Sequence, residues 1–337
     1  MFLTGVQALA RIPLQQLRAD REQGRSTAAF LSGYPGSPLA GLNFEIDKAR
    51  SLAPDLPIVH RPVLNEEHGA TAVMGSQLAP GQPDCVYDGI VGLWYGKAPG
   101  LDRAGDALRH AVFTGTSRHG GAVAIVGDDP AAKSSTLPSS SDAALVDLLM
   151  PILYPGDVKE VLTLGMHAVA LSRITGAWTA LKVVAAVADG SGTVDLSSSV
   201  VQPKVPDLTI DGVPYLHQPD ANLLTPNNLD LERDLRTSRA ELVRRYVVAN
   251  ELNPTTVNPP DAWIGIISSG FTYHQVIHAL NELGLKTHHE IASAGIRLLH
   301  LQLPIPFDPQ NIRNFANGLD EIIVVEEKNP TAEWLVK

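Results

Sequence analysis

Residues 27–38 read TAAFLSGYPGSP, a short apolar run followed at once by a turn. An apolar run of this length, bounded by turn residues, predicts a buried strand over Thr27–Ser32. Glycine and proline occupy four of the six positions 33–38, which predicts a tight turn, and a helix is expected to start near Leu39. A buried strand that passes through a tight turn into a helix is typical of α/β proteins with a parallel sheet.

The same alternation continues on both sides of this stretch. Residues 5–24 predict a helix in which Pro13 is a candidate break. Asp84–Leu93 and Ala122–Val126 are apolar and predict two further strands, with a helix over residues 101–114 between them. We therefore expect a doubly wound α/β domain with a mainly parallel sheet.

A second alternating pattern begins near residue 263. Three strands are predicted at Trp263–Gly270, Ile296–Leu303 and Glu321–Val325, with helices over residues 273–283 and 309–317. The stretch 191–230 is rich in proline, serine, aspartate and asparagine and predicts a long surface connection, followed by a helix over 233–250. Three strands are few for such a domain, and no closing turn follows them, so the sequence is expected to be part of a longer protein.

Composition narrows the function classes. The 26 basic and 36 acidic side chains give a formal net charge of −10, and no basic cluster exceeds a short pair, so neither nucleic acid nor an anionic membrane is expected as a partner. The single cysteine, Cys85, excludes an internal disulfide, an iron-sulfur cluster or a cysteine-rich zinc site within these residues. No secretory signal or membrane-length apolar run is present, so we expect a cytoplasmic protein.

The stretch Asn65-Glu66-Glu67 supports two interpretations. Asn65 can cap a helix whose first turn carries both acids, which would then lie exposed and favour the helix dipole by about 0.3–1 kcal/mol each. Alternatively, the small residues that follow, such as Gly69 and Ala70, leave room for a ligand at the helix start. A carboxylate in such a partly desolvated place could exchange a proton with that ligand.

Two glycine-rich segments are further candidates. The turn Gly33–Pro38 is expected at the carboxyl end of a strand, where ligands of α/β proteins bind, and Ser37 could hold an anionic oxygen there. The same residues are also ordinary turn formers. Residues 91–103 predict a loop that could close over a substrate, cross the surface, or contact another subunit.

The segment Gly115–Gly121 offers Arg118, whose planar guanidinium suits a carboxylate. The neighbouring His119-Gly-Gly is weakly similar to an esterase oxyanion loop, but the chain has no G-x-S-x-G motif, so a hydrolase is disfavoured. His274 and His278 stand four apart without the glutamate of an H-E-x-x-H motif, so a zinc site is also disfavoured.

Taken together and in order, these motifs resemble the indolepyruvate ferredoxin oxidoreductases, members of the thiamin diphosphate-dependent 2-oxoacid:ferredoxin oxidoreductase family. The motifs are Gly33–Pro38, Asn65–Glu67, Gly92–Arg103, Thr114–Gly121 with Gly127–Pro130, and Val324–Lys328. The resemblance implies a pyrimidine-binding thiamin domain over residues 1–200, a linker with a helix over 201–254, and a smaller transketolase C-terminal-like α/β domain over 255–337.

The resemblance also implies roles for single residues. Glu66 matches the glutamate that contacts N1′ of the cofactor's aminopyrimidine, and Gly36 falls in the turn that approaches the cofactor. Ser37 matches a hydroxyl residue that holds the substrate carboxylate, and Arg118 lies near the family's arginine beside the 2-oxo group. This makes Glu66 the expected catalytic residue and Glu67 the solvated acid of the helix start.

The implied reaction is oxidative decarboxylation of an aryl 2-oxo acid, with coenzyme A as acyl acceptor and electrons passed through [4Fe-4S] clusters to ferredoxin. The sequence has neither the Gly-Asp-Gly motif of the pyrophosphate- and Mg²⁺-binding domain nor cluster-binding cysteines. Other domains or subunits of the enzyme are therefore expected as partners, together with a homodimer, and the chain alone is expected to be inactive. The alternative is a non-catalytic binding or assembly module that retains the fold.

Overall fold

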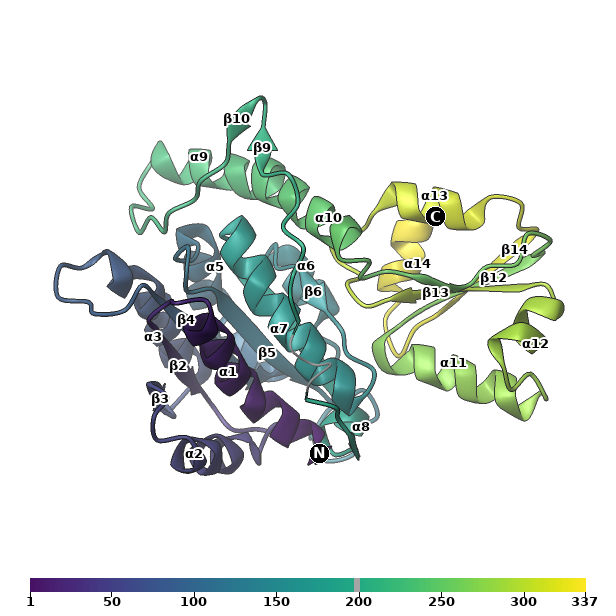
Figure 1. Cartoon of the computed structure of the whole chain (residues 1–337), viewed down its shortest axis with the longest axis horizontal. Helices are drawn as coiled ribbons and strands as arrows, with labels where there is room; N and C mark the ends of the chain where they lie inside the picture. The colour runs from purple at the N-terminus through teal and green to yellow at the C-terminus, as the bar shows by residue number, and fades with distance from the viewer. Residues whose placement is uncertain (197–200) are drawn as a thin grey trace.

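The computed structural model describes residues 1–196 and 201–337. It contains two α/β units that lie side by side (Figure 1), each a sheet with helices on both faces, and we call each unit a layer. The first is built on a six-stranded sheet with the order β3-β2-β4-β5-β7-β6, and the second on a four-stranded sheet with the order β11-β13-β12-β14. The mixed α/β architecture with a mainly parallel sheet, predicted from the sequence, is confirmed.

All neighbouring strands of the first sheet are parallel. Its strands are β2 (Thr27–Gly33), β3 (Ile58–His60), β4 (Gly89–Lys97), β5 (Ala122–Asp128), β6 (Ile152–Leu153) and β7 (Thr179–Val184). β2, β4, β5 and β7 are almost wholly buried along their length, because helices cover both faces of the sheet, as parallel sheets require.

The helices divide between the two faces. α1 (Gly5–Glu22) and α7 (Val158–Thr175) pack on one face, and α3 (Glu66–Leu78) and α5 (Gly105–Thr114) pack on the other. Shorter helices complete this layer: α2 (Leu42–Leu52), η1 (Ala79–Gly81), α4 (Ala98–Arg103), α6 (Asp142–Asp147) and α8 (Ala185–Ala188). Pro13 lies inside α1 and does not end it; the proline is buried against neighbouring elements, and this packing outweighs its missing hydrogen bond.

The glycine-rich segment 91–103 is not a loop, and this prediction is wrong. Residues 89–97 form the central strand β4, and helix α4 follows directly. Trp94 and Tyr95 are fully buried. The glycines serve close packing instead: a Cβ at Gly92 would lie 2.7 Å from the side chain of Val73 in α3.

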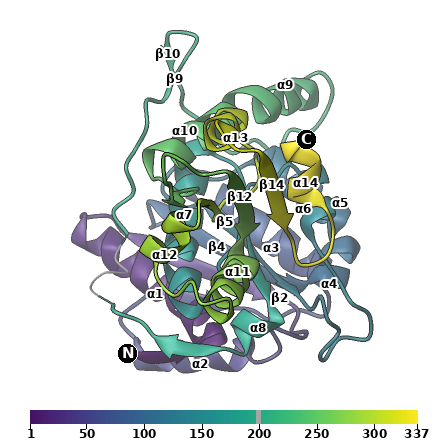
Figure 2. The same ribbon diagram turned by 90° about the vertical axis from the view of Figure 1, so that its right-hand side faces the viewer.

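The connection between the layers is partly regular. β8 (Ser191–Thr193) pairs with β1 (Phe2–Thr4), and β9 (Thr209–Ile210) with β10 (Val213–Pro214) form a small hairpin that stands away from the body (Figure 2). The predicted helix over 233–250 is part of a longer run composed of α9 (Asn227–Asp234), the π-helical turn η2 (Leu235–Arg239) and α10 (Ala240–Ala249).

The second sheet has four strands, one more than predicted. β12 (Ile264–Ser269), β13 (Ile296–Leu301) and β14 (Glu321–Val325) are parallel, and the additional strand β11 (Thr255–Val257) is antiparallel to β13. Helices α11 (Gly270–Glu282) and α12 (His288–Ser293) cover one face, and α13 (Pro309–Ala316) and α14 (Thr331–Val336) the other. Among the described helices of both layers, none is long and apolar enough to cross a membrane.

Candidate functional site at the carboxyl edge of the first sheet

Three of the predicted site residues lie at one edge of the six-stranded sheet. Gly36 and Ser37 follow the carboxyl end of β2, and Glu66 follows that of β3. Because the strands are parallel, their carboxyl ends share an edge, which is where ligands of open α/β sheets bind. The topology therefore brings residues 30 positions apart in sequence to the same part of the molecule.

Glu66 is buried at the start of α3. The side chain of Asn65 caps this helix, accepting a hydrogen bond from the His68 N–H at 3.0 Å. The two acids of the first turn then diverge, since Glu66 is only 5% exposed whereas Glu67 faces solvent. The indole N–H of Trp94 donates to the backbone carbonyl of Glu66 at 3.0 Å. The helix start is thereby fixed against the central strand.

The Glu66 carboxylate lies in a space that two glycines keep open. A Cβ atom at Gly100 would stand 2.3 Å from its Oε1, and one at Gly96 would stand 3.4 Å from its Cγ. Within residues 1–196 and 201–337, no group donates a hydrogen bond to this carboxylate. The side chain as a whole is buried, but its carboxylate oxygens are not among the fully buried polar atoms, so they remain open to a ligand. This side chain is therefore suited to receive a donor from a bound ligand.

The turn after β2 packs closely on the end of β4. A Cβ at Gly33 would lie 2.0 Å from the carbonyl oxygen of Tyr95, and one at Gly36 would lie 3.1 Å from Cδ of Lys97. Lys97 therefore lies along the turn rather than in a mobile loop. Ser37 is half-buried, and its hydroxyl contacts the hydroxyl of Ser134.

Ser134 belongs to a serine-rich loop that the sequence analysis did not single out. The Asp129 carboxylate accepts backbone hydrogen bonds from Lys133 at 2.9 Å and from Ser134 and Ser135 at 2.8 Å each. Burial acts to raise the pKa of Asp129, but these hydrogen bonds outweigh it and hold the pKa below its usual value. The loop is thus folded back over Ser37. The run of serines after Gly127-Asp-Asp-Pro130 is the sequence signal that could have indicated it.

The structure does not bring Arg118 to this site. Arg118 precedes β5, so it lies at the amino ends of the strands, whereas Glu66 and Ser37 lie at the carboxyl ends. Its side chain is exposed and borders a cavity on that opposite edge. The two ends of a parallel sheet are separated by the full strand length, which sequence order alone does not reveal.

A buried charge cluster joins the carboxyl edge to the second layer. Lys182 of β7 extends its ammonium to within 2.6 Å of Asp142 and 3.8 Å of Asp128. The ammonium also lies 4.5 Å from the ring centroid of Tyr154, whose hydroxyl donates to Glu327 just after β14. Burial acts to lower the pKa of Lys182, but the two aspartates outweigh it and hold the pKa above its usual value. The ammonium therefore stays charged, and the hydrogen bond from Tyr154 to Glu327 links this cluster to the second layer.

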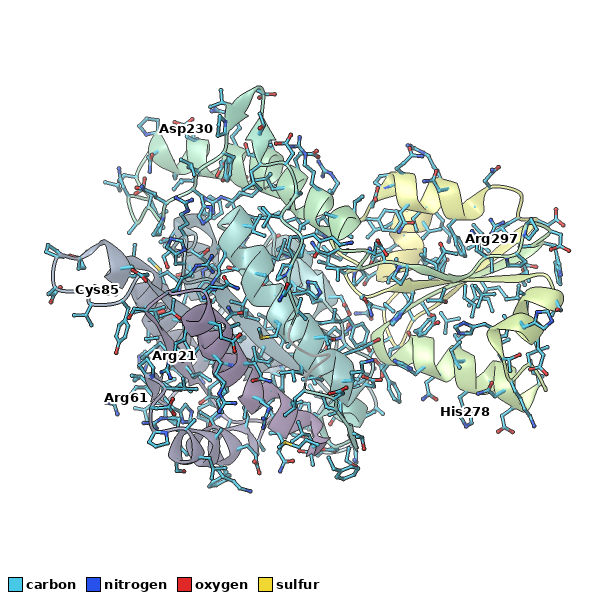
Figure 3. The ribbon with its side chains drawn as sticks, in the orientation of Figure 1. Arg21, Arg61, Cys85, Asp230, His278 and Arg297 are labelled. Atoms are coloured by element: carbon cyan, nitrogen blue, oxygen red, sulfur yellow. The ribbon has the colours of Figure 1, made fainter. Side chains whose placement is uncertain are left out.

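A second contact between the layers involves two histidines. The Glu160 carboxylate lies 3.8 Å from His274 and 3.9 Å from His300. Glu160 raises the pKa of His274, while burial lowers the pKa of His300 to about 4. His278, four residues along α11, points away from this contact into solvent (Figure 3). The pair at 274 and 278 therefore does not converge on one point.

The sequence is similar to one protein family over its C-terminal part and to several known proteins over almost its whole length. Residues 255–337 match the Indolepyruvate oxidoreductase domain family. The chain is 25% identical to the indolepyruvate oxidoreductase subunit IorA of Methanothermobacter thermautotrophicus over 334 residues, which is 99% of this chain and 47% of that protein. It is also 25% identical to IorA of Archaeoglobus fulgidus, over 100% of this chain and 48% of that protein. The chain thus spans about half the length of these relatives.

Two solved structures share the fold. The 2-oxoglutarate:ferredoxin oxidoreductase from Magnetococcus marinus superposes with a TM-score of 0.68 at 15% identity, covering 96% of this chain and 57% of that one. Transketolase from Leishmania mexicana gives 0.51 at 15% identity, covering 89% of this chain and 36% of that one. The resemblance to the 2-oxoacid:ferredoxin oxidoreductases and the expected thiamin-enzyme fold are therefore confirmed.

Proposed function

We propose that this chain supplies the pyrimidine-binding half of a thiamin diphosphate site in an oxidoreductase that acts on 2-oxo acids. The observation that carries the proposal is the Glu66 side chain, which is only 5% exposed, accepts no hydrogen bond from the described residues through its carboxylate, and faces a space kept open by Gly96 and Gly100. An aminopyrimidine ring offers a protonated ring nitrogen as donor and needs a flat, open space beside the carboxylate. The fold and the similarity to IorA subunits favour the same ligand.

In this proposal each residue of the carboxyl edge has a role. Glu66 accepts a hydrogen bond from N1′ of the aminopyrimidine, and Gly36 lets the backbone approach the cofactor. Ser37, held by the serine-rich loop, hydrogen-bonds the substrate carboxylate. Bound thiamin diphosphate supplies a nucleophilic carbon that attacks 2-oxo acids. Glu66 promotes that chemistry by holding the proton at N1′. Arg118 has no part in this site because it lies at the other edge.

The finer assignments rest on the resemblance. The substrate is an aryl 2-oxo acid, coenzyme A accepts the acyl group, and electrons pass through [4Fe-4S] clusters to ferredoxin in the cytoplasm. Residues 1–200 form the pyrimidine-binding domain, 201–254 the linker, and 255–337 the transketolase C-terminal-like domain. The Mg²⁺-binding pyrophosphate domain and the clusters belong to other parts of a homodimeric enzyme. These 337 residues contain neither a Gly-Asp-Gly motif nor a second cysteine, so turnover needs those other parts.

The test is Glu66→Gln in the complete enzyme, with Glu67→Gln as the matched control. Glutamine keeps the shape of the side chain but cannot hold the ring proton in the same way, so turnover of indolepyruvate should fall by about 10²-fold or more. The exchange rate of the C2 proton of bound thiamin diphosphate, followed by NMR, should fall in parallel. Glu67 is exposed, so its variant should retain wild-type rates.

Near-normal turnover in Glu66→Gln would overturn the proposal. Circular dichroism and the thermal midpoint of each variant establish that the fold is retained. If C2 exchange falls while another 2-oxo acid proves the better substrate, the cofactor assignment stands and only the aryl preference is wrong.

A further inference from the structure

A second candidate binding site lies at the amino ends of the first sheet, at the opposite edge from Glu66. A solvent-open cavity of about 590 Å³ is bordered there by the C-terminal part of α1, the turn before β5, α7 and the strap formed by residues 201–217. Figure 2 shows the first part of this strap running past α1 toward the β9–β10 hairpin, which the strap includes. We call this space the amino-edge cavity. Its volume is in the range of ordinary small-molecule sites.

The amino-edge cavity is positively charged in a chain whose net charge is −10. Arg25, Arg118 and Arg173 line it, and the described residues lining it include no carboxylate. The positive charge of Arg173 is neutralised by Asp20, because its guanidinium donates two hydrogen bonds of 2.6 and 2.7 Å to the Asp20 carboxylate. Arg25 reaches the same carboxylate only at 3.8 Å. Arg118 forms no ion pair or hydrogen bond with any described residue.

The backbone that carries Arg118 is held firmly in place. The buried side chain of Gln77 accepts hydrogen bonds from the N–H groups of Ser117 at 3.3 Å and Gly121 at 3.1 Å. Its amide group donates to the carbonyl of Ile90 at 2.9 Å. A buried glutamine that ties both sides of a turn to the sheet fixes where that turn points. The backbone at Arg118 is therefore held in one position beside the cavity, so little order has to be gained when a ligand binds.

The remaining walls combine an apolar surface with one unpartnered buried polar side chain. Met166 and Ile174 of α7 and Leu208 of the strap supply the apolar part. His217 is 9% exposed, and its Nε2 has no hydrogen-bond partner among the described residues. Burial lowers the pKa of His217 to about 4, so the ring is neutral at pH 7.

We propose that the amino-edge cavity binds a small organic carboxylate with an aromatic or branched aliphatic body. The unpaired guanidinium of Arg118 matches a carboxylate in two parallel hydrogen bonds. The apolar walls cover the body of the ligand. A nucleotide fits less well, because Arg25 and Arg173 both pair with Asp20, and among the described lining residues only Arg118 remains unpaired for several phosphate charges.

The experiment is a fluorescence titration of the purified full-length protein with 2-naphthoate. Saturable binding is expected. Arg118→Gln removes a charge-assisted interaction and should weaken binding roughly ten- to a hundredfold. Ala170→Phe fills the cavity from α7 without changing its charge and should weaken binding to a similar extent. Arg313→Gln removes an exposed arginine of α13, far from the cavity, and should leave binding unchanged.

A neutral ligand analogue and the thermal midpoints of the variants complete the test. Neutral 2-naphthamide should bind at least about tenfold more weakly than 2-naphthoate if Arg118 recognises the carboxylate. Absence of saturable binding, or binding that neither Arg118→Gln nor Ala170→Phe weakens, would overturn the proposal. Thermal midpoints show whether each variant is folded. The two variants distinguish this cavity from the Glu66 site, because Arg118 and Ala170 line the amino-edge cavity and neither belongs to the carboxyl edge.

Discussion

Replacing Gly100 by alanine tests the geometry around Glu66 most directly. Gly100 lies inside α4, where alanine is the better helix former by about 1 kcal/mol. The added Cβ would nevertheless stand 2.3 Å from Oε1 of Glu66, and 2.7 Å from its Cγ and Cδ. The obstacle is the end of a flexible side chain rather than backbone. The protein should therefore fold normally, and the carboxylate should be the group that moves.

The size of the effect follows from these distances. Cβ atoms essentially never approach another heavy atom within 3.0 Å, so the carboxylate must shift by at least about 0.7 Å. A misplacement of about 1 Å at a reacting group can cost about 10²-fold in rate. We therefore expect Gly100→Ala to lower turnover and C2 exchange of thiamin diphosphate by about 10- to 100-fold in the complete enzyme. The thermal midpoint should stay equal to the wild-type value or rise slightly.

The matched control is Gly105→Ala, five residues along the chain at the start of α5. A Cβ at Gly105 has no heavy atom within 4 Å, so activity should be unchanged. Steady-state rates and NMR exchange of the C2 proton provide the two measurements. Wild-type activity in Gly100→Ala, with the fold intact, would refute the idea that the Glu66 carboxylate in this position is the working group.

Two further predictions concern stability. Lys182→Met leaves the buried Asp128 and the partly buried Asp142 without their cation and should lower the free energy of unfolding by about 3–5 kcal/mol in urea titrations. Lys133→Met, which removes an exposed ion pair, should change it little. Equal effects of the two variants would contradict the assigned burial. His167 is partly buried beside the Tyr246 hydroxyl, and this burial lowers its pKa from 6.5 to about 4. The folded state therefore binds fewer protons than the unfolded state, so this contribution to stability is complete above pH 6.5 and is lost as the pH falls toward 4. In His167→Gln, the loss of unfolding free energy between pH 6.5 and 4 should be smaller by up to about 3 kcal/mol. If the pH profile of the unfolding free energy is the same in this variant as in the wild type, His167 is not held as a neutral imidazole in the folded state.

The order of strands and helices could largely be predicted from local patterns. Thr27–Ser32, Ala122–Val126 and Glu321–Val325 are short apolar runs next to turn residues, and each is a strand. The error at residues 91–103 has a simple cause, because glycine suggests a loop when only the sequence is considered. In the structure those glycines allow α3 and the Glu66 side chain to approach a central strand.

The sequence by itself determined the α/β class, the helix start at Asn65–Glu67 and the family resemblance, because each depends on residues close together in the chain. The resemblance already distinguished Glu66 from the solvated Glu67, but only the tertiary structure showed that Glu66 is buried against β4 and that Ser134 contacts Ser37. It alone also separated Arg118 from Glu66, by placing them at opposite ends of parallel strands. The physical reason is that burial and charge pairing depend on segments far apart in sequence, whose positions are fixed only when the sheet is assembled.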